Sequence, residues 1–207
     1  MKKVLVATQK PFAPAAVEQI KAVFDEANYS CSFFEKYETQ DELINAIGDA
    51  EAMIVRSDKI TPEVIEAAKH LKIVVRAGAG YDNVNLEAAT AKDVVVMNTP
   101  GQNSNAVAEL ALGMMVYMAR NQFNGTSGTE LSGGKKLGIH AYGNVGRLVA
   151  RVAKGFGMEV VAFDPFIADE LITNDGVQVC KKVEDLYRSC DFISLHIPAN
   201  AQDRKSV

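Results

Sequence analysis

Short apolar runs rich in β-branched residues alternate with amphipathic stretches along most of the chain. The apolar runs predict strands at residues 3–8, 32–35, 52–55, 73–76, 94–98, 137–141, 159–163 and 191–196. The amphipathic stretches predict helices at residues 15–27, 40–47, 62–70, 86–91, 106–120, 145–156 and 183–189. Such regular alternation of strand and helix favours an α/β fold, in which helices cover both faces of parallel sheets.

The order of the elements indicates two doubly wound units. Residues 1–100 carry five of the predicted strands, and a second series of three starts at residue 137. We assign residues 1–100 to the first domain and residues 101–207, which include the long apolar helix at 106–120, to the second. The polar stretch "NQFNGTSGTELSGGKK" after that helix has the turn chemistry expected of a boundary. A complete doubly wound nucleotide domain has about six strands, so the second series is about half of one.

Composition and charge favour a soluble globular protein of the cytoplasm. Hydrophobic residues make up 48% and charged residues 23%, and the net charge of −4 comes with scattered Lys and Arg. This balance predicts neither nucleic acid nor membrane as a partner. The N-terminus lacks the apolar run of a signal peptide. The three cysteines lack metal-ligand spacing and are interpreted as ordinary thiols in a reducing compartment, so no metal site is predicted.

A glycine loop, "GIHAYGNVG" at residues 138–146, joins a predicted strand to a predicted helix. In such a loop one glycine lets the backbone approach a pyrophosphate and another lets helix and strand pack closely. Gly143 and Gly146 occupy these two positions, and the helix N-terminus behind them offers free N–H groups to phosphates. Ala141 stands where the first glycine of the pattern falls, and we expect one added methyl group to be tolerated there.

An acidic residue at the end of the following strand completes the pattern. Asp164 lies 21 residues after Gly143 (164 − 143), close to the spacing of about 20 expected of an acid that binds the ribose 2′-hydroxyl. A carboxylate there would repel a 2′-phosphate, so the cofactor predicted is NAD rather than NADP. The alternative is that Asp164 and Pro165 form only a strand-end turn. We interpret His140, in the strand before the loop, as a packing neighbour without a chemical role.

A second glycine loop, "VRAGAGYDNVN" at residues 75–85, suggests an anion site in the first unit. Gly78 and Gly80 would expose backbone N–H groups in a concave nest, and Arg56 and Arg76 fall at the ends of two strands. The alternative is that both arginines are solvated strand-end residues. Three polar residues between the next strand and the long helix are candidate substrate contacts, or simply turn and capping residues: Asn98, Asn103 and Ser104. The natural N-cap of that helix is Ser104 or Asn105.

Five linked motifs resemble those of one family. "VRAGAGYDNVN", "VMNTPGQNSNAVAEL", "LGIHAYGNVGR", "AFDPF" and "ISLHIPA" occur in the order and spacing of the D-isomer-specific 2-hydroxyacid dehydrogenases. The resemblance implies a flavodoxin-like substrate-binding domain, an NAD-binding Rossmann domain and an active site in the cleft. The members that the chain most resembles oxidise 3-phospho-D-glycerate to 3-phosphohydroxypyruvate with NAD, for serine biosynthesis. In many members the helix from about residue 106 lies in a dimer interface, which implies a homodimer.

The resemblance also implies roles for individual residues. The positions that match substrate contacts, for a small anionic substrate, are Arg56, Arg76, Gly78, Ala79, Gly80 and Asn103. The positions that match cofactor contacts are Ala79, Tyr142, Gly143, Asn144, Val145, Gly146, Asp164, His196, Ile197 and Pro198.

The family's catalytic residues have no counterpart in this sequence. Its catalytic arginine, the acidic partner of that arginine and the acid–base histidine fall beyond the position that matches Val207. Neither His140 nor His196 matches the histidine, so we assign no catalytic residue. The expectation from this pattern is a C-terminally truncated chain that is inactive alone and exposes an apolar sheet edge.

Three other functions remain open from the sequence. Other members of the family use different 2-hydroxy acids, such as lactate, glycerate or glyoxylate-derived substrates, although the two arginines favour a phosphorylated one. A non-catalytic NAD-sensing protein, similar to the C-terminal-binding-protein corepressors, would keep the same cleft. A methyltransferase with a glycine loop for S-adenosylmethionine is disfavoured by the paired domains.

Overall fold

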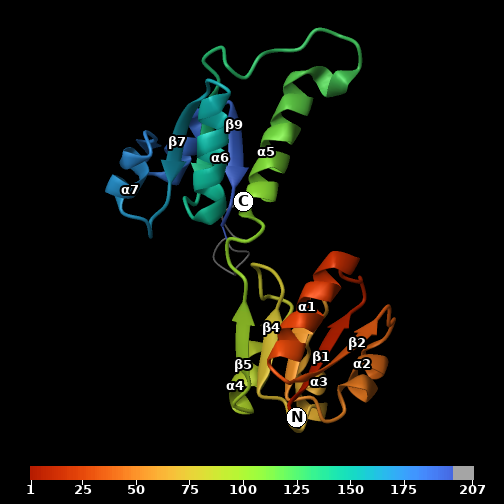
Figure 1. Ribbon diagram of the computed structural model, residues 1–207. Coiled ribbons are helices and arrows are strands. Elements are labelled where there is room, and N and C mark those ends of the chain that lie inside the picture. The colour runs from red at the N-terminus through yellow and green to blue at the C-terminus, as the bar shows by residue number, and fades with distance from the viewer. Residues whose placement is uncertain (198–207) are drawn as a thin grey trace. The chain divides into compact units, whose positions relative to one another are not determined.

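The computed structural model describes residues 1–197, which fold into two compact units divided between Gln102 and Asn103 (Figure 1). Each unit has a parallel sheet with helices connecting its strands. The α/β class predicted from the alternating pattern is therefore confirmed.

The first unit is a five-stranded parallel sheet with the order β2-β1-β3-β4-β5. Along the chain its elements are β1 (Lys3–Thr8), α1 (Pro14–Glu26), β2 (Ser30–Glu35), α2 (Gln40–Ile47), β3 (Ala52–Val55), α3 (Pro62–Ala67), β4 (Ile73–Arg76), α4 (Leu86–Ala91) and β5 (Val95–Asn98). This is the flavodoxin-like order expected. β2 lies on one side of β1, and β3, β4 and β5 follow one another on the other side. Right-handed crossovers therefore place α1 on one face of the sheet and the other three helices on the opposite face.

Helix α2 shows how packing and capping set the ends of an element in the first unit. Leu43 and Ile47 of α2 are buried in the core of that unit, and Thr39 caps the helix by accepting a hydrogen bond from the Glu42 amide at 3.2 Å. Gly48 ends the helix with a φ of 53°, a conformation that glycine adopts without steric cost. The capping side chain of Thr39 and the backbone conformation of Gly48 thus set the two ends of α2.

The second unit is a four-stranded parallel sheet with the order β8-β7-β6-β9. Its elements are α5 (Ser104–Ala119), a 3-10 turn (Asn121–Phe123), β6 (Lys136–His140), α6 (Asn144–Gly155), β7 (Glu159–Phe163), α7 (Asp169–Asn174), β8 (Gln178–Val179), α8 (Val183–Ser189) and β9 (Phe192–Leu195). In sequence order the strands run 3-2-1-4, as in the first part of a Rossmann sheet. The sequence predicted only three strands because β8 has two residues, too few to show alternation.

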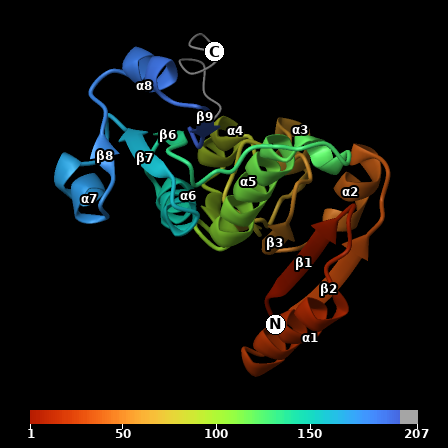
Figure 2. The ribbon, with the colours of Figure 1, turned by 90° about the horizontal axis from the view of Figure 1, so that it is seen from above.

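Helix α5 belongs to the second unit and packs beside α6 in both views (Figures 1 and 2). Ala108, Leu112 and Met115 form its buried side. The polar stretch after α5, which has the turn chemistry of a boundary, therefore lies inside this unit. Among the described helices, α5 included, none has the length and apolar character needed to cross a membrane.

The contrast between buried and exposed leucines in the first unit gives a direct test of this core. Leu43 is fully buried, whereas Leu86 in α4 is 43% exposed. Leu43→Ala should lower the unfolding free energy of the unit by about 2–5 kcal/mol, because it leaves a cavity. The matched change Leu86→Ala should cost less than about 1 kcal/mol. Urea denaturation measures both; equal losses would contradict the assigned core.

Candidate functional site

A buried carboxylate organises the carboxyl edge of the first sheet. Asp58 lies just after β3 and is only 4% exposed. It accepts hydrogen bonds from the Gln9 amide at 2.7 Å, the Tyr37 hydroxyl at 2.8 Å and the Arg56 amide at 3.1 Å. Burial and, next, the bond to Asp58 raise the pKa of Tyr37 far above its ordinary value. Asp58 thereby joins the segments that follow β1, β2 and β3, a role that sequence analysis did not assign.

The two arginines at this edge are used differently. Nη1 of Arg56 donates to the carbonyls of Lys10 at 2.8 Å and Pro11 at 2.9 Å, and its guanidinium lies 5.2 Å from the centre of the Phe12 ring. The Arg76 side chain makes no hydrogen bond or ion pair within residues 1–197, and its Nε is buried. Arg56 therefore clamps the loop after β1, while the charge of Arg76 remains available.

The loop after β4 forms a smaller nest than the sequence suggested. The Gly78 amide donates to the Arg76 carbonyl at 2.8 Å, which closes a tight turn, so the prediction that Gly78 exposes its N–H is wrong. The amides of Ala79 and Gly80 have no acceptor in the described part of the chain. The Asn98 side chain fixes the loop by donating to the Ala79 carbonyl at 2.6 Å. Two adjacent N–H groups thus remain free to hold an anion.

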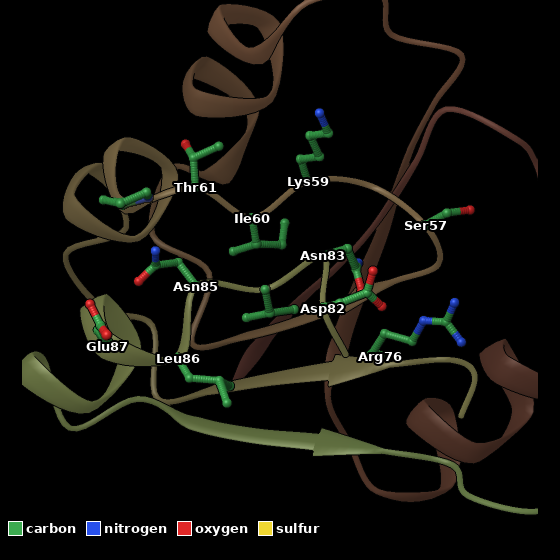
Figure 3. Close-up of a pocket in the computed structure, with 12 residues that line it drawn as sticks. Ser57, Lys59, Ile60, Thr61, Arg76, Asp82, Asn83, Asn85, Leu86 and Glu87 are labelled. Atoms are coloured by element: carbon green, nitrogen blue, oxygen red, sulfur yellow. The ribbon is translucent and has the colours of Figure 1, made fainter. Parts of the chain in front are cut away.

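A cavity of about 720 Å³ lies beside this loop, within the first unit. Figure 3 shows Arg76 and Asp82 at one end of it and Asn85, Leu86 and Glu87 at the other. The segments that form it are joined by a parallel bridge between Ile60 and Val84. Its lining mixes cationic, anionic and apolar groups, so it has no single charge preference.

In the second unit, the glycine loop turns sharply at the end of β6. Ala141 adopts a φ of 79°, in the left-handed region. An alanine there costs roughly 1–2 kcal/mol relative to a glycine, so the substitution is tolerated at the expense of local strain. A Cβ on Gly146 would lie 2.3 Å from the Ala141 carbonyl oxygen. Only a glycine at 146 allows helix and strand to approach this closely.

The N-terminus of α6 is open for an anion. Gly143 is its N-cap and provides no side-chain cap, and no acidic residue occupies the first turn. A Cβ on Gly143 would meet nothing within 4 Å, so the space in front of the helix is clear. The first-turn amides of Asn144 and Val145 therefore lack intrahelical acceptors and point toward this space.

Asp164 is held beside this loop by two backbone amides. Its Oδ2 accepts from the Tyr142 amide at 2.7 Å and its Oδ1 from the Phe166 amide at 2.8 Å. Each carboxylate oxygen keeps a further lone pair for a ligand hydroxyl. The structure thus brings the acid and the glycine loop together, as their spacing predicts.

Tyr142 faces the core rather than the loop. Its side chain is fully buried and its hydroxyl lies 3.2 Å from Asp175, which also binds Nε of Arg147 at 3.0 Å. Burial raises the pKa of Tyr142, and the Arg147 bond lowers that of Asp175. Because the Tyr142 amide is bonded to Asp164, the contact that we expected from Tyr142 is confined to positioning that acid.

Of the two histidines of this unit, His140 ends β6 and His196 directly follows the neighbouring strand β9. Nδ1 of His140 is 2.7 Å from the Tyr187 hydroxyl, which joins β6 to α8, in keeping with a packing role. Nε2 of His196 is 2.8 Å from the Ser194 hydroxyl, and burial lowers the pKa of His196. Ile197 is half-buried, and Pro198 lies outside the described residues.

The start of α5 differs from the expectation. We predicted Ser104 or Asn105 as the N-cap, but the helix begins at Ser104 and Asn103 is its N-cap. The Asn103 side chain makes no capping bond and is exposed, so its amide is free for a ligand. The Asn105 side chain instead donates to Glu109 at 2.6 Å.

Fold and site together define a doubly wound α/β protein with a glycine loop of the dinucleotide-binding type after β6 and a second glycine loop after β4. Residues 4–195 match the family described as "D-isomer specific 2-hydroxyacid dehydrogenase, catalytic domain". Because the match spans most of the sequence, the chain belongs to this family, and the resemblance of its motifs is confirmed.

Individual relatives agree with this assignment. The chain is 39% identical to a D-3-phosphoglycerate dehydrogenase of Methanocaldococcus jannaschii over 82% of its own length and 35% of the relative's. It is 38% identical to a hydroxypyruvate reductase of Thermotoga maritima over 81% of its length and 58% of the relative's. The crystal structure of NAD⁺-bound 3-phosphoglycerate dehydrogenase from Entamoeba histolytica is similar with a TM-score of 0.90 and 45% identity, covering 97% of this chain and 64% of that one. The chain thus spans 35% of the first of these curated relatives.

The two glycines of the dinucleotide loop should differ in their effect on stability. Gly146→Ala should lower the unfolding free energy of the second unit by about 1–3 kcal/mol, because the methyl group meets the Ala141 carbonyl. Gly143→Ala has open space and should change it by about 0.5 kcal/mol or less. Denaturant unfolding of the two variants compares them directly; a large loss in Gly143→Ala alone would contradict the loop geometry.

Proposed function

We propose that this chain binds NAD and serves the oxidation of 3-phospho-D-glycerate to 3-phosphohydroxypyruvate, a reaction of serine biosynthesis. The observation that carries the proposal is the position of Asp164, bonded to the Tyr142 amide beside an uncapped helix N-terminus. Pyrophosphate at that N-terminus would bring the adenosine ribose to the carboxylate. The free thiols of Cys31, Cys180 and Cys190 support a reducing, cytoplasmic location.

The preference for a phosphorylated acid rests on the first unit. The unpaired guanidinium of Arg76 and the free amides of Ala79 and Gly80 offer charge and N–H donors to an anionic substrate. Arg56 supports them by holding the neighbouring loop. The main alternative is another 2-hydroxy acid, and the similarity to a hydroxypyruvate reductase makes it a specific one.

Bound at the glycine loop after β6, NAD would supply the acceptor for the hydride of the carbon that carries the substrate hydroxyl. The residues of this chain bind and orient: the α6 N-terminus holds phosphate, Asp164 holds the ribose, and Arg76 holds the substrate anion. We assign no residue of the described part to proton transfer. The chain's contribution is thus the placement of cofactor and substrate.

Cofactor selection provides the test of the proposal. The full chain should bind NAD⁺ more tightly than NADP⁺ in calorimetric titration. Asp164→Ser should weaken NAD⁺ binding by roughly tenfold and abolish the discrimination, because one charge-assisted hydrogen bond to the ribose is lost. Asp169→Ser, which removes a partly exposed acid of α7 that pairs with Lys181, is the control and should change neither affinity.

The substrate is tested in the same way, with 3-phospho-D-glycerate, D-glycerate and D-lactate as titrants. Binding that favours 3-phospho-D-glycerate supports the proposal. Preference for NADP⁺ in the wild type, or equal binding of the three acids, would contradict it.

We further propose that the protein is a homodimer formed through α5. Leu110, Met114, Tyr117 and Met118 lie on one side of this helix and are 65%, 60%, 44% and 57% exposed. Their spacing makes a continuous apolar stripe opposite the buried side. The family resemblance, which implies a dimer interface at this helix, supports a second copy of the chain as the partner.

Sedimentation velocity tests the dimer. The wild type should sediment as a dimer and Met114→Lys as a monomer, because a lysine at the centre of the stripe would bury an unpaired charge. Val23→Lys replaces an apolar residue of α1 that is 62% exposed and should leave the dimer intact. A monomeric wild type would contradict the proposal.

A further inference from the structure

The guanidinium of Arg76 occupies the space that a side chain on residue 78 would fill. A Cβ built on Gly78 would lie 1.4 Å from Nη1 and 2.4 Å from Cζ of Arg76. Real Cβ atoms never approach this closely, so any other residue at 78 would displace the guanidinium. The absence of one methyl group therefore fixes the place of the only charged group in this loop's first turn.

Neither backbone conformation nor exposure of an amide explains a glycine at this position. Gly78 does not have a positive φ, so an alanine could adopt its backbone conformation. Its N–H is already donated to the Arg76 carbonyl at 2.8 Å. Gly80 provides a contrast in the same loop, since a Cβ there would meet only Asp82, with Oδ1 at 3.1 Å. The requirement at 78 is space for the arginine.

Of the two arginines at this edge, Arg76 is the one whose guanidinium has no hydrogen-bond or ion-pair partner in the described residues. Arg56 donates to two backbone carbonyls, whereas the Arg76 guanidinium has no partner within residues 1–197 and its Nε is buried. A buried donor without a partner calls for a ligand or a bound solvent molecule. An anion beside the free Ala79 and Gly80 amides would supply that partner.

We propose that Gly78 is a positioning residue: its missing side chain seats the Arg76 guanidinium beside the free amides of the loop, where Arg76 recognises the anionic group of the substrate. This inference deepens the proposed function and rests on it for the identity of the ligand. The position of the Arg76 guanidinium over Gly78 is a property of the protein without ligand, so it can be tested without any ligand.

The position of the guanidinium is read from the Arg76 Nε–H signal in ¹H–¹⁵N spectra of the full chain. Arg76→Lys identifies the signal, because lysine has no such group. Gly78→Ala should shift or broaden the signal, whereas Gly80→Ala, the matched control, should leave it in place. An unchanged Arg76 signal in Gly78→Ala would overturn the proposal.

A stability cycle covers the case in which Gly78→Ala perturbs folding. If the added methyl group acts by clashing with the guanidinium, Arg76→Ala must remove the clash. The double variant Arg76→Ala/Gly78→Ala should then be as stable as Arg76→Ala alone. Persistent destabilisation in the double variant would show a different cause and would also overturn the proposal.

Titration with 3-phospho-D-glycerate connects the seat to binding. Gly78→Ala and Arg76→Ala should each weaken binding by roughly ten- to a hundredfold, the range for a charge-assisted contact, and the double variant should bind no more weakly than Arg76→Ala. Additive losses would contradict the inference. If the wild type does not bind 3-phospho-D-glycerate, that result counts against the proposed function. The Nε–H comparison still tests whether Gly78 positions the Arg76 guanidinium.

Discussion

The close approach between the Ala141 carbonyl and Gly146 is the constraint on which the candidate site of the second unit depends. A Cβ at 146 would lie 2.3 Å from that oxygen, so the N-terminus of α6 can sit directly over the end of β6. This contact turns the first amides of the helix toward open space and leaves the Tyr142 amide free to hold Asp164. The strain at Ala141 accompanies the same turn. One absent side chain thus orients both the open amides of α6 and the carboxylate of Asp164.

In the first unit a buried charge, rather than a glycine, orders the loops around the candidate site. The buried carboxylate of Asp58 joins the segments after three parallel strands, and it fixes the backbone of Arg56. Arg56 in turn holds the loop after β1 through two carbonyls. Because parallel strands bring their carboxyl ends to one edge, a single carboxylate can order all these loops. The short turn at Gly78, closed by the hydrogen bond to the Arg76 carbonyl, follows at the same edge.

The sequence predicted the elements and the dinucleotide loop well, because both depend on local patterns. Apolar periodicity marked all five strands of the first sheet. The spacing from Gly143 indicated an acid near the loop, and the structure has Asp164 there, bonded to the Tyr142 amide. The role of Asp58 was not predicted, since its partners Gln9 and Tyr37 are 49 and 21 residues away. A charged residue after a strand has the same appearance in sequence whether it is buried or solvated.

The error at Gly78 has a related cause. A glycine-rich loop indicates exposed amides, but the hydrogen bond from Gly78 to the Arg76 carbonyl depends on the turn that the backbone takes. The predicted N-cap of α5, Ser104 or Asn105, was wrong by one or two residues, because Asn103 ends the loop without using its side chain. Local composition predicts which residues can act, whereas the backbone path decides which atoms are free.

We propose that the α6 N-terminus with Asp164 holds NAD while Arg76 holds an anionic substrate. A crystal structure of the full chain with NAD⁺ and 3-phospho-D-glycerate is the decisive test. We expect pyrophosphate on the Asn144 and Val145 amides, the adenosine ribose on Asp164 and a substrate anion on Arg76. Nucleotide bound away from this loop, or a substrate that leaves Arg76 without a partner, would contradict it.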